Sequence, residues 1–293
     1  MKKKLPVIFI ILLLSLGLAL LIYPAVSDLI SKWTSSAAVN RYQQYVDEMG
    51  DSAKQDMLTA AAEYNRGLSG TIIKDAFSSD DGESVEQNKE YYSLLNLNGV
   101  MAYVEIPSIG VYLPIYHGTG QDALKKGVGH LEGSALPVGG LGTHSVISAH
   151  RGLPDAKLFT DLDQIETGDL FYIHVLGETL AYEVDRIEVV APEDVGSLTA
   201  VQGKDYVTLM TCTPYGINSH RMLVRGIRTE YTDEPIHGNH FYSYSNEVRA
   251  LPAWMAAAGG AILYLILAAV AGGIKGRKKM RSKLGHIRKR GEG

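Results

Sequence analysis

Two long stretches without a charged residue constrain this chain of 293 residues more than any other feature. They cover residues 5–27 and 250–274, which is 23 and 25 residues. About 20 apolar residues in a helix are enough to cross the hydrocarbon core of a bilayer. We therefore expect residues 1–27 to form an N-terminal transmembrane anchor or signal segment, and residues 250–274 to form a C-terminal transmembrane helix.

Basic residues flank both stretches on the side of the chain termini. Lys2, Lys3 and Lys4 precede the first, and nine Lys or Arg residues lie in the tail, residues 275–293. Positive charge beside a membrane helix favours the cytoplasmic side. We therefore expect both termini, including this basic cytoplasmic tail, inside the cell and the segment between the helices outside, at the cell membrane in contact with membrane lipid. A cleaved signal peptide is the alternative for the first stretch, although its apolar core exceeds the usual length.

The segment between the two stretches is acidic. Residues 28–249 contain 16 basic and 31 acidic residues, a net charge of −15. Phosphate binding needs Lys and Arg side chains concentrated on one face, so this composition argues against nucleic acid as a partner. The whole chain is 46% hydrophobic and 20% charged, which excludes a disordered protein.

The acidic segment changes character along its length. Residues 27–67 have a helical pattern, with Asp51 and Ser52 as a plausible cap between two helices, and residues 70–87 indicate a loop. From residue 99 onwards, seven short runs rich in Val, Ile, Tyr and Thr follow one another within about 130 residues. This favours a mainly β fold, a barrel or sandwich. We assign residues 28–98 to a helical extension, 99–230 to the β domain and 231–249 to a linker.

Cys212 is the only cysteine of the chain and lies in the segment expected outside the cell. It cannot form an intramolecular disulfide, so it is a buried passenger, an intermolecular bridge or a reactive thiol. Cys212 ends one apolar run, and Arg221 opens the next after a turn that contains Pro and Gly. We expect both at one end of a hairpin. His150 also ends an apolar run and precedes a turn.

These three residue types suit nucleophilic catalysis. A thiol needs a nearby positive charge to favour the thiolate, and His150 could supply it and later protonate a leaving amine. Arg221 could stabilise an oxyanion. The alternative reading makes Cys212 a small buried hydrophobe, His150 a turn residue and Arg221 a surface cation. Sequence separation alone does not place His150 beside Cys212.

The sequence around these residues closely resembles the sortase family. The motifs are TLMTC at 208–212 followed by TPYGINSHRMLVRG, SAHRGLPDAKLFTDL around His150, and IPSIGVYLPIYHG at 106–118. The similarity spans about residues 99–229. The two membrane segments and the helical extension are similar to the class C, pilin-polymerising branch. Housekeeping sortases usually have one N-terminal anchor.

The resemblance implies an eight-stranded sortase-type β-barrel and a cysteine transpeptidase on the outer face of a Gram-positive membrane. Cys212 would attack the Thr–Gly bond of an LPxTG-like sorting signal and form a thioacyl-enzyme. His150 would be the general acid/base, and Arg221 would orient the substrate and stabilise the oxyanion. A lysine amine of another pilin subunit would accept the acyl group, so that pili are polymerised. No cofactor and no metal is implied.

Class C relatives also carry a lid with an Asp followed two residues later by an aromatic residue. Asp75 and Phe77 match this pattern within the predicted loop. By resemblance, Asp75 would pair with Arg221 and Phe77 would cover the thiol. The middle residue is often proline, and Ala76 should make the lid backbone less rigid. The alternative is an ordinary loop that Phe77 anchors on the core.

Three other functions stay open at this stage. The first is a housekeeping-type sortase that attaches proteins to peptidoglycan, and the second is a cysteine hydrolase in which water resolves the thioacyl-enzyme. The third is non-enzymatic, a membrane-tethered adhesin or assembly platform with an incidental cysteine. A metal site is not expected, because the nine histidines show no ligand spacing with Cys or carboxylates.

Overall fold

The computed structural model describes residues 5–68, 75–77 and 88–231. The chain divides into two units, residues 24–245 and residues 1–23 with 246–293. Of the second unit, only residues 5–23 are described. The expected C-terminal transmembrane helix at 250–274, the basic tail at 275–293, almost all of the linker at 231–249 and most of the predicted loop at 70–87 lie outside the described residues.

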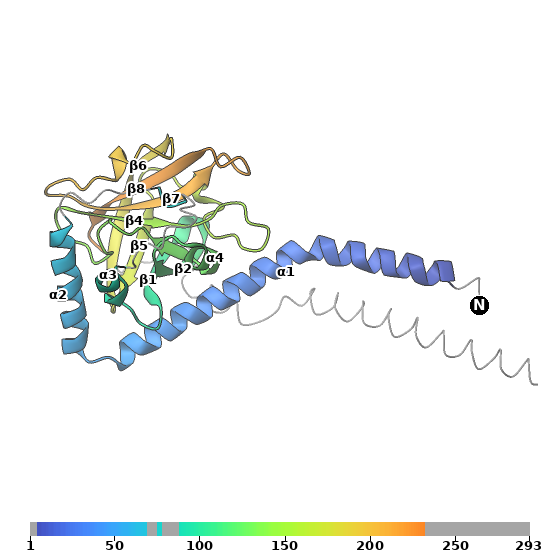
Figure 1. Cartoon of the computed structure of the whole chain (residues 1–293), viewed down its shortest axis with the longest axis horizontal. Helices are drawn as coiled ribbons and strands as arrows, with labels where there is room; N and C mark the ends of the chain where they lie inside the picture. The colour runs from blue at the N-terminus through green and yellow to red at the C-terminus, as the bar shows by residue number, and fades with distance from the viewer. Residues whose placement is uncertain (1–4, 69–74, 78–87, 232–293) are drawn as a thin grey trace, which may run out of the picture. The chain divides into compact units, whose positions relative to one another are not determined.

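Two helices form the N-terminal part of the chain. Helix α1 (Leu5–Glu48) contains the first uncharged stretch and is long and apolar enough to cross a membrane. Helix α2 (Asp51–Gly67) follows, and Figure 1 shows it beside the barrel. The expected cap at Asp51 and Ser52 is wrong by one residue. Gly50, in an extended conformation, is the N-cap, and Asp51 lies in the first turn, where its charge favours the helix dipole.

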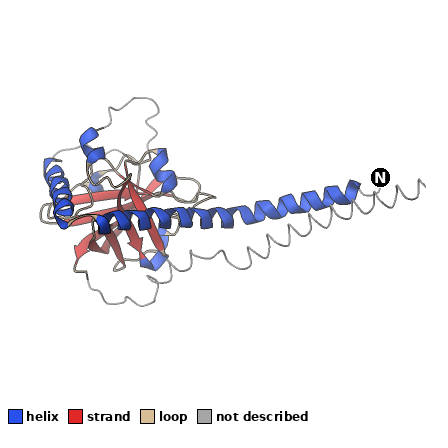
Figure 2. Cartoon of the chain, turned by 90° about the horizontal axis from the view of Figure 1, so that it is seen from below, coloured by secondary structure: helices blue, strands red, loops and turns tan. Residues whose placement is uncertain are grey.

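Eight strands close into a barrel in the order β1-β2-β3-β4-β7-β8-β6-β5 (Figures 1 and 2). The pairs β2–β3 and β4–β7 are parallel, and the others are antiparallel. The strands are β1 (Val100–Ile106), β2 (Val111–His117), β3 (Val128–His130), β4 (Thr143–Ser148), β5 (Leu170–Val175), β6 (Glu178–Val190), β7 (Asp205–Thr213) and β8 (His220–Thr229). This confirms the expected mainly β fold, an eight-stranded barrel with an N-terminal helical extension.

Short helical segments fill the connections. They are α3 (Lys89–Ser93), α4 (Gln121–Lys126) and the 3₁₀ turns η1 (Pro107–Ile109), η2 (Leu162–Gln164) and η3 (Gly196–Leu198). The helical extension is fixed to the barrel by apolar and polar contacts. Tyr42 of α1 is buried and its hydroxyl accepts a hydrogen bond from the backbone N–H of Leu176, while Asn65 of α2 exchanges two hydrogen bonds with the backbone of Leu136.

Alternation along the strands separates two apolar clusters. On β4, Ile147 faces the main core inside the barrel, whereas Val146 faces outward. On β7 and β8, Met210 and Leu223 face outward in the same way and pack with Val146. The outer face of β4, β7 and β8 therefore carries a second, smaller cluster.

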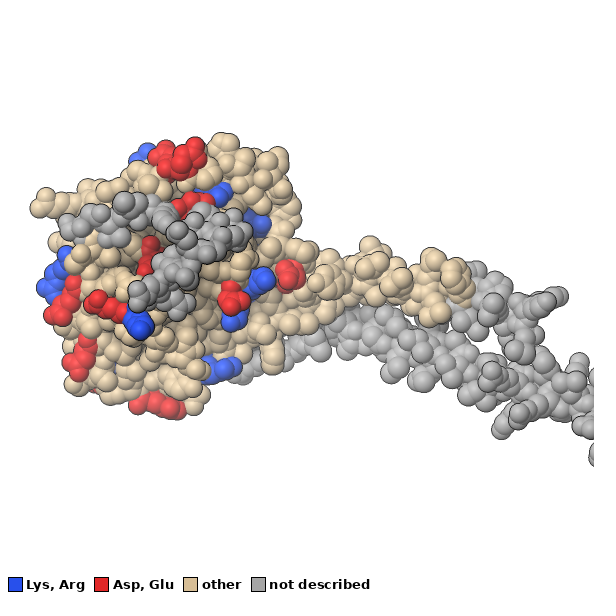
Figure 3. Space-filling model, in the orientation of Figure 1, with Lys and Arg blue, Asp and Glu red and all other residues tan. Residues whose placement is uncertain are grey.

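Charged side chains are distributed differently between residues 5–23 and residues 24–231. Figure 3 shows acidic and basic side chains on the visible face of residues 24–231. The described residues 5–23 contain none. This difference fits a membrane segment followed by a water-exposed domain.

Candidate active site

The strand pairing brings the three predicted residues to one end of the outer face. Cys212 on β7 is the direct cross-strand partner of Arg221 on β8. On the other side of β7, the parallel strand β4 pairs Ser148 with Met210. Two hydrogen bonds beside it, from Ala149 N–H to Met210 O (3.1 Å) and from Thr211 Oγ1 to Ala149 O (2.8 Å), continue this register to the residue before His150.

His150, two residues past the end of β4, therefore lies in one row with Cys212 on β7 and Arg221 on β8. The hairpin expected from the turn between Cys212 and Arg221 is present. The neighbourhood of His150 comes from the parallel pairing of β4 and β7, whose paired residues are 62 positions apart. Sequence patterns carry no direct signal for such a pairing.

The residues that match the lid pattern cover this row. Asp75 accepts two hydrogen bonds from Arg221, from Nε at 2.7 Å and from Nη2 at 2.6 Å. The Phe77 ring lies 5.2 Å from the Arg221 guanidinium carbon and 5.6 Å from the His150 ring, measured to ring centroids. We call residues 75–77 the lid segment.

All three guanidinium nitrogens of Arg221 donate hydrogen bonds. Besides the two bonds to Asp75, its Nη1 donates to the backbone carbonyls of Asn218 and His220, each at 3.1 Å. The hydrogen bonds to Asp75 raise the pKa of Arg221, and its side chain is almost fully buried. A substrate carbonyl can gain the Nε donor, and the Nη2 N–H that faces Asp75, only when Asp75 gives them up.

Burial in this arrangement favours the neutral thiol and the neutral imidazole. Cys212 is 7% exposed, and burial raises its pKa more than the neighbouring Arg221 lowers it; the Asp75 carboxylate raises it further. Burial also lowers the pKa of His150, and the positive charge of Lys125 adds to that shift. The Cys212 thiol is therefore protonated at neutral pH while the lid segment is in place.

The lid segment packs into an apolar cluster on the same outer face as Cys212, and we call this cluster the recess. It includes outward-facing residues of β4, β7 and β8 and residues of the connection between β6 and β7, residues 191–204. Ala76 is buried in it, and Phe77 packs against it. The other members are Leu131, Val146, Val190, Val195, Leu198, Met210 and Leu223.

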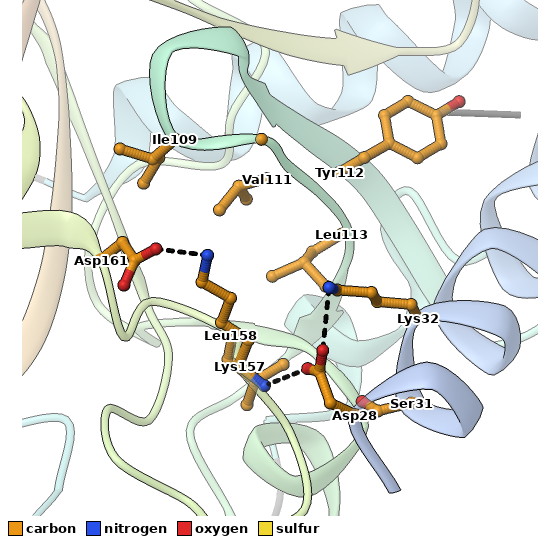
Figure 4. Close-up of a pocket in the computed structure, with 11 residues that line it drawn as sticks. Asp28, Ser31, Lys32, Ile109, Val111, Tyr112, Leu113, Lys157, Leu158 and Asp161 are labelled. Carbon is orange, nitrogen blue, oxygen red and sulfur yellow. Dashed lines mark hydrogen bonds and ion pairs between the residues drawn. The ribbon is translucent and has the colours of Figure 1, made fainter. Parts of the chain in front are cut away.

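The loop that follows His150 is fastened at two points. Phe159 N–H donates to His150 O at 3.2 Å, which folds the loop back on His150. Farther along, Lys157 N–H donates to the Asp28 carboxylate of α1 at 3.0 Å, and Lys32 pairs with the same carboxylate at 2.8 Å (Figure 4). Lys157 Nζ in turn pairs with Asp161. The start of the helical extension thus supports the loop of a proposed site residue.

A close approach connects the same loop to the β7–β8 turn. Gly152 has φ of +77°, and a Cβ at this position would lie 2.9 Å from the Tyr215 ring. Glycine meets both requirements, the left-handed backbone and the absence of a side chain. The loop after His150 and the turn after Cys212 are therefore packed against each other at Gly152 and Tyr215.

Residues 104–229 match the Sortase domain family. Among solved structures, the chain is similar to sortase C1 of Streptococcus agalactiae in complex with MTSET, with 43% identity and a TM-score of 0.63. The match covers 69% of this chain and 100% of that one. The chain belongs to the sortase family. A second similar structure is sortase C of Streptococcus pneumoniae, with 45% identity, a TM-score of 0.62 and coverage of 68% and 100%.

Curated sortases match over a shorter part. Sortase D of Bacillus subtilis (strain 168) is 32% identical over 112 residues, 38% of this chain and 54% of the relative. Sortase A of Streptococcus agalactiae serotype III (strain NEM316) is 30% identical over 117 residues, 39% and 47%. The chain thus spans about half the length of these curated relatives. The solved neighbours named above are class C sortases, the branch that the sequence resembles.

Two features of this sortase site were not predicted from the sequence. The first is Ser148, which alternation on β4 places on the same outward face as His150 and which could have been found by counting two residues back. The second is the contact that the connection between β6 and β7, residues 191–204, makes with the recess through Leu198. This connection has no strand periodicity that could have indicated the contact. Among the described residues, no group of three or more His, Cys, Asp or Glu side chains could hold a metal ion.

Proposed function

We propose that this sortase is a membrane-anchored cysteine transpeptidase that polymerises pilins. The observation that carries the proposal is the row of His150, Cys212 and Arg221 on the outer face, next to the apolar cluster on which the lid segment packs. Helix α1 supplies the proposed anchor, and the catalytic domain would lie outside the cell with both termini in the cytoplasm.

The first half-reaction is acylation. Cys212 Sγ attacks the threonine carbonyl of an LPxTG-like sorting signal, and Arg221 stabilises the oxyanion with the donors that Asp75 releases. The Thr–Gly C–N bond breaks, an S–C bond forms, and His150 transfers the thiol proton to the leaving glycine amine. Displacement of the lid segment precedes this step, because Asp75 and the peptide compete for the same N–H groups.

The second half-reaction is transfer. The lysine amine of another pilin subunit attacks the thioacyl carbon, with His150 taking the proton that the amine loses. The S–C bond breaks and an isopeptide bond forms, so that the thiol is restored once His150 returns the proton. Water in place of the amine would give hydrolysis, and a peptidoglycan amine would give cell-wall attachment.

Two observations favour pilins as the substrate class. The helical extension and the Asp75–Arg221 contact correspond to the class C features, and the similar Streptococcus pneumoniae sortase C is described in connection with pilin substrate specificity. The apolar α1 helix supports anchoring at the membrane, where a secreted pilin precursor would meet the enzyme.

Acylation is tested with the full-length chain in detergent micelles, an LPxTG-type peptide and intact mass spectrometry. We expect an adduct with the mass of the peptide cleaved after threonine, located on Cys212 and absent from Cys212→Ala. The Phe77→Ala variant should form it faster, because the recess is open. An adduct of equal yield in Cys212→Ala would contradict the proposal, as would the absence of any adduct from both the wild-type chain and Phe77→Ala.

A further inference from the structure

Ser148 lies on the outer face of β4, between two residues of the site. Its neighbours in sequence, Ile147 and Ala149, belong to the core inside the barrel. The residue two positions before it, Val146, belongs to the recess. Successive strand residues point to opposite faces, so Ser148 shares the outward face with Val146 and His150. Its cross-strand partner on β7 is Met210, which also belongs to the recess.

The Ser148 hydroxyl is buried without a partner. The residue is 0% exposed, and among the described residues Oγ has no hydrogen-bond partner. Buried hydroxyl groups are normally paired, because an unmade hydrogen bond costs free energy. The lid side chains that occupy the recess, Ala76 and Phe77, are apolar and give this hydroxyl nothing to bind. Ser148 thus offers an unused donor and acceptor on the outward face that it shares with Val146 and His150.

We propose that Ser148 recognises the peptide that replaces the lid segment, by a hydrogen bond to the side-chain hydroxyl of the threonine at the scissile bond. This inference rests on the proposed function. The threonine carbonyl must lie between Cys212 and Arg221, in the same row as His150. Ser148 is two residues, about 6.6 Å, from His150 along the strand, which is within reach of a side chain attached to the reacting residue.

The proposed bond gives a chemical reason for threonine at this position. A hydroxyl can both donate and accept, and so can its partner on Ser148. Valine has nearly the same shape as threonine but would leave Ser148 unpaired in a buried site. Sites built to bind a substrate hydroxyl discriminate against analogues that lack it for this reason.

The test measures kcat/KM for acylation with two peptides that differ only in threonine or valine at the scissile position. All enzymes are full-length, in detergent micelles, and carry Phe77→Ala so that lid opening does not limit the rate. The parent should prefer the threonine peptide by on the order of tenfold. Adding Ser148→Ala should reduce turnover of the threonine peptide by about that factor and leave the valine peptide nearly unchanged, which removes the preference.

Ser145→Ala is the matched control. Ser145 lies on the same strand, and its Oγ is also buried without a partner among the described residues. It is an odd-numbered residue of β4, like Ile147, and so faces the barrel interior instead of the recess. Ser145→Ala should keep the threonine preference of the parent.

Three results would overturn the inference. They are an equal loss with both peptides in Ser148→Ala, an unchanged preference in Ser148→Ala, and loss of the preference in Ser145→Ala. Since the readout is a ratio measured on one preparation, a partly unfolded variant does not alter it. If no peptide acylates the parent at all, the proposed function fails and this inference fails with it. A parent that is acylated but shows no serine-dependent preference removes only the inference.

Discussion

Arg221 has two competing uses, and the described structure shows one of them. Its Nε and Nη2 bind Asp75, and the same donors are needed for the carbonyl of a peptide in the proposed reaction. Burial raises the pKa of Cys212, and the Asp75 carboxylate raises it further. In the proposed reaction, Asp75 therefore both occupies donors that the oxyanion needs and disfavours the thiolate.

Replacing Asp75 should therefore activate the thiol. In Asp75→Asn, the pKa of Cys212 should fall and the lid segment should bind more weakly. We expect alkylation by iodoacetamide near neutral pH to accelerate by at least about fivefold, because this ion pair is buried and should contribute more than the ~1 kcal/mol of an exposed pair. The readout is the pH dependence of the alkylation rate, and it reports Cys212 alone because the chain has one cysteine.

Asp185→Asn is the matched control for this experiment. Asp185 accepts two hydrogen bonds from Arg225 at 2.9 and 2.8 Å, the same arrangement as Asp75 with Arg221 but without a contact to the lid segment. It should leave the alkylation rate as in the wild-type chain. If Asp75→Asn and the wild-type chain were alkylated at the same rate at every pH, the lid segment would not control the thiol.

At the scale of elements, the loop after His150 depends on α1. Asp28→Ala removes the acceptor of the Lys157 N–H bond and the partner of Lys32. We expect hydrogen exchange in residues 151–161 to accelerate by about fivefold, the effect of losing one hydrogen bond worth about 1 kcal/mol. Asp28→Asn keeps an oxygen acceptor and should show a smaller change. Equal exchange in Asp28→Ala and the wild-type chain would mean that α1 does not support the loop.

The sequence predicts local pairings better than distant ones. Arg221 follows Cys212 by nine positions, and the segment between them contains Pro and Gly. This local spacing predicts the hairpin in which the two residues are cross-strand partners. Strand β3 has three residues, too few for a periodic pattern, so the residue patterns give seven of the eight strands. The parallel pairing of β4 with β7, which brings His150 to Cys212, and the Asp75–Arg221 contact both join segments far apart in the chain. The resemblance to sortases supplied the expectations that His150 acts with Cys212 and that Asp75 pairs with Arg221, and residue patterns predicted neither the parallel pairing nor the contact.

For the whole molecule, two buried histidines should make the fold sensitive to acid. His130 binds the Tyr91 hydroxyl through Nδ1 and the Ala135 carbonyl through Nε2, and burial lowers its pKa to about 4. His144 binds Thr208 and the Thr199 carbonyl, and burial lowers its pKa to about 4 as well. Both histidines are therefore neutral in the folded protein at pH values where unfolding would let them bind a proton.

The sign follows from these pKa values. Because the folded values lie below the ordinary value of about 6.5, stability is full above that pH and falls as the pH drops towards 4. As the pH drops from about 6.5 to 4, each histidine should lower the free energy of unfolding by roughly 3 kcal/mol. We expect denaturant unfolding at several pH values to show it, and His130→Gln and His144→Gln each to reduce the slope against pH by up to one proton. Slopes that neither substitution changes would contradict this assignment.

In the proposed reaction, the acyl group on Cys212 passes to an amine. The most direct test incubates the full-length chain in detergent micelles with an LPxTG-type peptide and a lysine-bearing pilin domain, and sequences the products by tandem mass spectrometry. We expect an isopeptide bond between the threonine carbonyl and a lysine Nε, formed by the wild-type chain and not by Cys212→Ala. Release of only the hydrolysed peptide, with a free threonine carboxylate despite the acceptor, would identify a hydrolase and rule out the proposed transfer.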